Sequence, residues 1–153
     1  MTLYKKLVRL LIEKIDKLIA LYERKYGTRD PFEIARCLKI KVYYRPLKNI
    51  AGYYKYMKHN RCIYINSEIE DNVFRRVVMA HELGHAVLHM KDNCTFMKGH
   101  TLLLTSKTEK QANIFAARLL ITEELIHDFE GYTREQFCDC TGYPEELIKL
   151  RLA

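Results

Sequence analysis

The stretch AHELGHAVLH, residues Ala80 to His89, carries the pattern that decides this fold. Residues four apart lie on one face of an α-helix, so His81 and His85 can direct both imidazoles at one point. Zinc accepts such nitrogens at about 2.0–2.1 Å. Glu82 is rotated by about 100° from His81 and can reach a water molecule beside the metal as a general base. The pattern predicts a metal-binding helix, and the alternative is a helix whose histidines pack or face solvent.

A catalytic zinc also needs a third protein ligand and an open fourth position. Four downstream residues are candidates: His89, Asp92, His100 and Glu109. His89 is rotated away from the helix face that holds His81. His100 lies in a predicted loop and could reach the metal from there. Glu109 is early on the next predicted helix, and Asn113 is one turn behind it. Two antiparallel helices, one with His81 and His85 and the other with Glu109, would form a rigid three-point clamp, in which Asn113 could hold the outer nitrogen of a histidine.

Gly84 interrupts this helix at a cost of about 1 kcal/mol relative to alanine. A glycine at this position predicts the close approach of another backbone or of a substrate. Loose packing of the helix against a neighbour is the alternative.

Hydrophobic periodicity predicts a first half that runs from helix to strands. Apolar residues recur at helical spacing over residues 3–25, and Asp30 and Pro31 then begin a short helix that ends near Leu38. Three β-branched and aromatic segments follow, IKVYYRP, AGYYKYMK and RCIYIN. They predict a small three-stranded sheet, as a meander or a hairpin.

The second half is predicted to be helical. In NSEIEDNVFRRVVMAHELGHAVLHM, Ser67 and Glu70 fit a capping box at the start of the histidine helix. A loop is expected from Lys91 to Ser106, then a helix over KTEKQANIFAARLLI, then a helical pair at Thr133–Asp139 and Pro144–Leu152. The fold class is therefore α+β and mainly helical. We expect one domain over residues 1–153, with a core at about 28–122 and a small helical tail at 123–153.

Composition and charge limit the class of protein and the kinds of partner that the chain could have. The chain has 153 residues, 48% hydrophobic and 29% charged, which is typical of a soluble globular protein. No apolar run approaches the roughly 18 residues of a membrane span, and the five scattered cysteines favour free thiols in the cytoplasm. Residues 1–61 hold 16 basic and 5 acidic residues, a balance of +11. This basic half attracts nucleic acid or an acidic protein, or it is simply a solvated face, which we favour.

The paired motifs AHELGHAVLH and EKQANIFAARLL resemble the ImmA/IrrE family of zinc metallopeptidase-like proteins, as do the upstream DPFEIARCLKIKVYYRPL and RCIYIN. The resemblance covers roughly residues 28–122. It implies a zincin-like fold, Zn²⁺ ligands at His81, His85 and Glu109, and Glu82 as the catalytic acid/base. Family members often carry a proline soon after FAARLL, where this chain has Ile121 and Thr122. The resemblance therefore does not predict how that helix ends.

The resemblance also implies a biological setting. Members often occur in phages and integrative elements, and some cleave a helix-turn-helix repressor; others cleave a repressor during stress responses. We therefore expect a cytoplasmic zinc metallo-endopeptidase whose substrate is a helix-turn-helix transcriptional repressor. Tyr64, at the end of a strand, and His100 are the candidates for a donor that stabilises the oxyanion of the reaction.

Two functions of other classes compete with this hypothesis. The tail pair has the outline of a DNA-binding helix-turn-helix, but Pro144, Glu145 and Glu146 begin its second helix, where carboxylates would repel phosphates. Only Lys149 and Arg151 favour contact, so direct nucleic-acid binding is disfavoured. The other rival is a catalytically silent protein of the same fold that sequesters a repressor. An intact Glu82 favours the enzyme, because a pure binder has no need of a base beside the metal.

Overall fold

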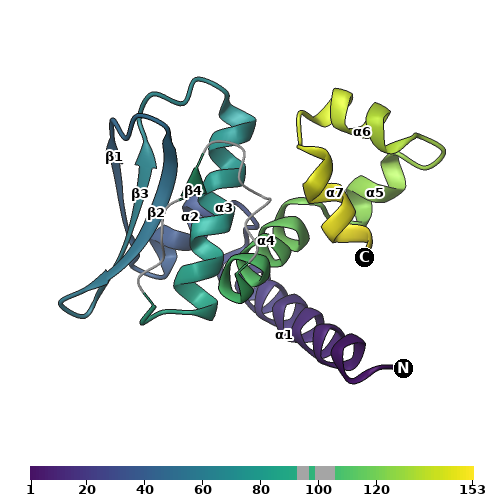
Figure 1. The fold of residues 1–153 in the computed structure, drawn as a ribbon, viewed down its shortest axis with the longest axis horizontal. Coiled ribbons are helices and arrows are strands. Elements are labelled where there is room, and N and C mark those ends of the chain that lie inside the picture. The colour runs from purple at the N-terminus through teal and green to yellow at the C-terminus, as the bar shows by residue number, and fades with distance from the viewer. Residues whose placement is uncertain (93–96, 99–105) are drawn as a thin grey trace.

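The computed structural model describes residues 1–92, 97–98 and 106–153, with the backbone alone at 97–98. A small sheet lies at one side of the molecule, α3 (Asn72–Leu88) crosses beside it, and α4 (Lys107–Leu120) packs against α3 (Figure 1). α1 (Leu3–Tyr26) projects on one side, and the tail of α5 (Glu123–Asp128), α6 (Arg134–Thr141) and α7 (Glu145–Leu152) lies at the end away from the sheet. The predicted α+β class, mainly helical with a small sheet, is confirmed.

The sheet has the order β1-β3-β2-β4. β2 (Ile50–Met57) and β3 (Asn60–Asn66) form the predicted hairpin, turning at Lys58 and His59, which both have positive φ as two-residue hairpin turns require. β1 (Lys41–Arg45), however, pairs parallel with β3, so the meander is wrong. β3 is an inner strand between β1 and β2, and its Ile63 and Ile65 are completely buried.

A fourth strand corrects the predicted loop from Lys91 to Ser106. β4 (Met97–Lys98) pairs antiparallel with β2 at the edge of the sheet. Two residues are too few to show alternating hydrophobicity, so no sequence pattern indicates this strand.

The histidine helix begins later than predicted. Its first residue is Asn72, and the N-cap is Asp71, whose carboxylate accepts hydrogen bonds from the backbone of Val73 and Phe74. The predicted capping box of Ser67 and Glu70 is therefore wrong. The preceding Asn66 fixes a turn instead, because its side chain accepts from the backbone of Leu47 and Glu68 and donates to the carbonyls of Lys48 and Ile50.

The core lies around the second half of α3. Every residue from Val77 to Ala86 is buried there, between the sheet and α4. Gly52 on β2 permits the close approach of α3, because a Cβ at this position would lie 2.9 Å from Val78 Cγ1 and 2.8 Å from the carbonyl oxygen of Tyr64. The histidine stretch is thus inside the molecule, as predicted.

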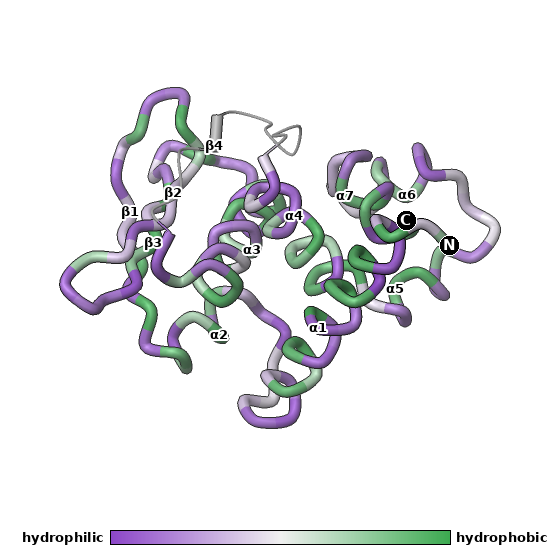
Figure 2. The backbone as a smooth tube through the Cα atoms, turned by 60° about the horizontal axis from the view of Figure 1, so that its bottom comes forward, coloured by the Kyte–Doolittle hydropathy of each residue, from purple (hydrophilic) through white to green (hydrophobic). Residues whose placement is uncertain are grey.

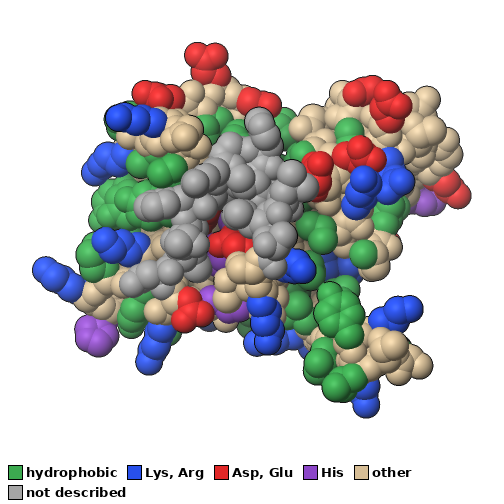
Figure 3. All heavy atoms as spheres, in the orientation of Figure 1, with side chains coloured by type: hydrophobic (Ala, Val, Ile, Leu, Met, Phe, Trp, Pro, Cys, Tyr) green, Lys and Arg blue, Asp and Glu red, His purple; other side chains and the backbone are tan. Residues whose placement is uncertain are grey.

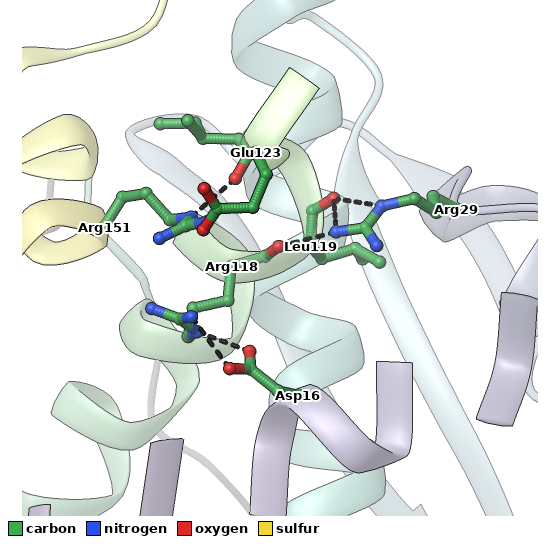
Figure 4. A network of polar contacts seen from close by, with 7 residues as sticks. Asp16, Arg29, Arg118, Leu119, Glu123 and Arg151 are labelled. Atoms are coloured by element: carbon green, nitrogen blue, oxygen red, sulfur yellow. Dashed lines mark hydrogen bonds and ion pairs between the residues drawn. The ribbon is translucent and has the colours of Figure 1, made fainter. Parts of the chain in front are cut away.

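Three arginines surround the end of α4 (Figure 4). Arg29 donates to the carbonyls of Arg118 and Leu119, and Arg151 on α7 donates to the carbonyl of Ile121 at 2.7 Å. Arg118 itself pairs with Asp16 on α1. The contacts of Arg29 and Arg151 stabilise the carbonyls at the end of α4, which have no partner within the helix.

The chain leaves α4 without the proline common in the family. Ile121 is extended, and Thr122 caps α5, a short helix that the sequence analysis did not predict. The predicted tail pair is confirmed as α6 and α7, with Gly142 in the left-handed region between them. No described helix has the length and apolar character needed to span a membrane.

Candidate metal centre

Two helices bring the predicted ligands together. His81 and His85 come from one face of α3, and Glu109 comes from the first turn of α4, where Ser106 caps the helix by accepting from the Glu109 backbone. One ligand atom of each residue lies within 4.8 Å of the others. All three side chains are buried, so the cluster is inside the protein and not a surface group of charges.

The distances between the three side chains are short. Glu109 Oε2 lies 2.8 Å from His81 Nε2, Glu109 Oε1 lies 3.0 Å from His85 Nε2, and the two Nε2 atoms are 3.2 Å apart. A carboxylate and two imidazole nitrogens that face one common point form a donor set that suits a divalent transition metal with open positions. The cluster is therefore compatible with metal binding.

Asn113 orients the first histidine. Its Oδ1 lies 2.6 Å from His81 Nδ1, and it is on α4 one turn after Glu109. Because an amide oxygen only accepts hydrogen bonds, His81 Nδ1 carries the proton in this contact and Nε2 is left for the cluster. The predicted position of Asn113 beside a histidine is thus realised.

Burial and mutual contacts shift the pKa values in the metal-free site. Burial would raise the pKa of Glu109, but hydrogen bonds from His81 and His85 outweigh it and lower this pKa to about 2. Burial lowers the pKa of His85. For His81, burial acts in the same direction, yet contacts with Glu109, Asn113 and the Glu82 charge raise its pKa. The carboxylate of Glu109 therefore stays ionised, as a metal ligand must be.

Glu82 is the exceptional residue of the site. Its side chain is almost completely buried, and neither carboxylate oxygen has a hydrogen-bond partner in the part of the chain that the structure describes. Burial, together with the charge of Glu109, raises the pKa of Glu82 to about 8, although His81 opposes the shift. A buried carboxyl group with a raised pKa, beside a cluster of side chains that could bind a metal, is typical of a catalytic acid or base.

The other candidate ligands do not join the cluster. His89 ends α3, and its ring lies 6.1 Å from that of His85 between centroids. Asp92 is exposed beyond the helix. His100 lies outside the described residues, so its candidacy as a ligand or an oxyanion donor stays a prediction.

Tyr64 lies on the face of the sheet opposite to α3. Its neighbours Ile63 and Ile65 point into the core, so alternation along β3 turns Tyr64 outward. There its ring stacks between Tyr43 and Tyr53, at centroid distances of 5.1 and 4.5 Å. The prediction of Tyr64 as an oxyanion donor is therefore wrong. Tyr54, which the sequence analysis did not single out, faces α3, and its hydroxyl donates to the carbonyl of Met90 just after the helix.

Gly84 sets the distance between the two ligand helices. A Cβ at this position would lie 3.1 Å from Cα and 3.2 Å from the carbonyl oxygen of Ala112, and 3.2 Å from Phe115 Cβ. The glycine thus permits a close approach of the α4 backbone, as predicted, and loose packing is not the reason for it.

The model of the IrrE N-terminal-like domain family matches residues 35–141 of the chain, a span that includes the whole cluster. The chain belongs to this family. Two relatives extend the match beyond that range. An "Uncharacterized immunity region protein 2" of Bacillus phage phi105 is 38% identical over 131 residues, which cover 84% of this chain and 82% of the relative. The "Metallopeptidase ImmA" of Bacillus subtilis strain 168 is 28% identical over 134 residues, 84% of this chain and 78% of the relative.

Family membership agrees with the geometry. The IrrE N-terminal-like family is a metallopeptidase family, and the matched range holds both the His81–His85 helix and the Glu109 helix. The predicted ImmA/IrrE resemblance is confirmed.

Proposed function

We propose that this member of the IrrE N-terminal-like family is a zinc-dependent endopeptidase. His81, His85 and Glu109 hold the metal, and Glu82 acts as the catalytic acid/base. The observation that supports this most directly is the buried Glu82 carboxyl group, which has no hydrogen-bond partner among the described residues. Burying such a group without a partner destabilises the fold, and a role in the reaction accounts for its presence at this position.

The donor set fits zinc. Two histidine nitrogens and one carboxylate leave a fourth position open, as catalytic zinc sites do. The two Nε2 atoms face each other at 3.2 Å, and Glu109 Oε1 lies 3.0 Å from His85 Nε2, so three donor atoms converge where a cation would bind. The low pKa of His85 keeps its ring neutral, which is the form that binds metal.

Glu82 transfers the proton in the proposed reaction. When bound, zinc supplies a Lewis acid that polarises the peptide carbonyl and acidifies the attacking water. Glu82 then accepts the proton of that water and returns it to the leaving amine. With a pKa of about 8 in the metal-free site, Glu82 is largely protonated at neutral pH. A nearby divalent charge favours the ionised form and so lowers this pKa toward the range that a base needs.

We further propose that the substrate is a helix-turn-helix repressor encoded by a phage, a mobile element or a stress regulon. The relative from phage phi105 is named for an immunity region, and the Bacillus subtilis relative is named a metallopeptidase. The phage origin of one relative and the metallopeptidase name of the other support this proposal. A cytoplasmic location follows from such a substrate.

The two rival functions receive less support. A silent repressor-binding protein has no use for the buried Glu82 carboxyl. In the tail, Arg151 would be one of two cations for DNA contact, but it is buried and pairs with Glu123 and the Ile121 carbonyl. Of these two cations, Lys149 then remains for DNA contact, and it lies on α7 together with the carboxylates of Glu145 and Glu146.

Incubation of the purified protein with a candidate helix-turn-helix repressor tests the proposal. Zinc-loaded protein should produce two defined fragments, and a chelator should abolish them. The Glu82→Gln variant should bind zinc with unchanged stoichiometry and leave the repressor intact, since only the base is lost. Cleavage by Glu82→Gln at the wild-type rate would rule out the role assigned to this residue.

A further inference from the structure

The first ten residues of α1 leave an apolar surface uncovered. Leu3, Tyr4, Leu7 and Leu10 are 73%, 71%, 56% and 51% exposed, and their spacing of three and four places them along one side of the helix. We call these four residues the α1 stripe. The buried residues of α1 all lie in its second half: Ile15, Ile19 and Tyr22. The first half thus projects from the body of the protein (Figure 1).

This projecting half is both apolar and basic. Residues 1–12 contain Lys5, Lys6 and Arg9 and no acidic residue. Hydrophilic and hydrophobic residues interleave along α1 (Figure 2). Contiguous apolar surface of this kind marks an interaction site, and an isolated half-helix of this length is only marginally stable in water. The matching partner is apolar and acidic.

The tail of the same chain has that character. Residues 122–146 hold eight acidic residues and a single basic residue, Arg134. Acidic side chains gather on the tail in Figure 3, while hydrophobic and basic side chains gather on the projecting end of α1. The tail also has a hollow of about 100 Å³, lined mainly by apolar side chains, among them Phe129, Tyr132 and Leu152, and also by Arg134. Tyr132 and Leu152 are 54% and 56% exposed. We call Phe129, Tyr132, Leu152 and the neighbouring Asp128 and Glu130 the tail surface.

We propose that two copies of the chain form a reciprocal dimer, in which the α1 stripe of each copy packs on the tail surface of the other. The projecting end of α1 and the tail extend on the same side of the molecule, away from the sheet (Figure 1). A two-fold axis on that side makes both contacts at once, as an isologous dimer requires. Direct pairing of two α1 stripes is disfavoured, because it would bring Lys5, Lys6 and Arg9 of the two copies together.

The two-fold arrangement also halves the surface area that each contact has to bury. The smallest specific interfaces bury about 1,200 Å² in total, so each of the two equivalent contacts has to bury about 600 Å². None of His81, Glu82, His85 and Glu109 belongs to either surface. The dimer is therefore independent of the metal centre and of the proposed peptidase activity.

Light scattering on the full-length protein, from low to high micromolar concentrations at low salt, tests for the dimer. The mass should rise from 18.2 kDa toward twice that value. Leu7→Glu should keep the mass at that of the monomer, because it places a charge in the α1 stripe. Leu21→Glu is the matched control, since Leu21 is 40% exposed on the second half of the same helix, and this variant should still dimerise. Circular dichroism should show that both variants are folded.

Charge reversal identifies which surfaces meet. One variant combines Lys5→Glu and Lys6→Glu, and a second combines Asp128→Lys and Glu130→Lys. Each alone should be monomeric, since like charges then face each other at both contacts. An equimolar mixture should form a heterodimer, because both contacts again join opposite charges. If the second variant dimerises as the wild type does, the stripes pair with each other and the proposal fails. A wild type that stays monomeric, or that instead binds anionic lipid vesicles, overturns it as well.

Discussion

Gly84→Ala tests whether helix spacing fixes the geometry of the metal site. The added Cβ would lie 3.1–3.2 Å from three atoms of α4, two of which belong to the Ala112 backbone and cannot rotate away. α4 must therefore move away by a few tenths of an ångström. Overpacking of this kind costs about 1–3 kcal/mol, and the better helix propensity of alanine returns about 1 kcal/mol. We expect a net loss of about 1 kcal/mol in the free energy of unfolding.

The larger effect should be on metal affinity. Glu109 is three residues before Ala112 on the same helix, so the shift displaces its carboxylate by a similar amount. Metal–ligand distances tolerate only about 0.2 Å. Zinc affinity, measured by competition with a chelating dye, should fall about tenfold or more, whereas Lys110→Ala on the exposed side of α4 should leave it unchanged. A Gly84→Ala protein with wild-type stability and zinc affinity would show that the spacing of the helices does not position Glu109.

Three further predictions concern the same site and the tail. Asn113→Ala should lower zinc affinity by about 10- to 100-fold with little change in fold, because His81 loses the partner that orients it; calorimetric titration measures this. In metal-free protein, Glu82 has a pKa raised from 4.5 to about 8, so its contribution to stability is full below pH 4.5 and is lost as the pH rises toward 8. Between pH 5 and pH 8, wild type should lose about 3 kcal/mol more than Glu82→Gln in urea unfolding, and an equal pH dependence of the two proteins would refute this. Arg151→Met should destabilise the tail by about 1–3 kcal/mol, because the Ile121 carbonyl loses its buried donor; limited proteolysis should then cut first within α5 to α7.

Local patterns sufficed for the helices and for the cluster of candidate ligands. His81, His85, Glu109 and Asn113 could be predicted because helical periodicity relates residues within one turn, and because each ligand helix has its own apolar face. The start of α3 could not be predicted in this way. The side chain of Asn66 bonds to the backbone of residues 47, 48 and 50, and such contacts with a distant segment leave no periodic trace in the sequence.

Strand order and the environment of single side chains depend on the assembled fold. The parallel pairing of β1 with β3 brings Tyr43 beside Tyr64, although β2 separates the two strands in the sequence. The isolation of the Glu82 carboxyl is likewise the result of packing by the sheet and α4. Alternation in the strand RCIYIN could have indicated the outward position of Tyr64, since Ile63 and Ile65 are the apolar pair in that strand.

X-ray absorption at the zinc edge of the loaded protein tests the central claim most directly. Metal analysis should find one zinc per chain, and the spectrum should show two imidazole nitrogens at about 2.0–2.1 Å and oxygen ligands at about 2.0–2.2 Å, with one protein oxygen lost in Glu109→Ala. Sulfur ligands at about 2.3 Å, or a spectrum that is the same in Glu109→Ala, would contradict a metal centre built from His81, His85 and Glu109.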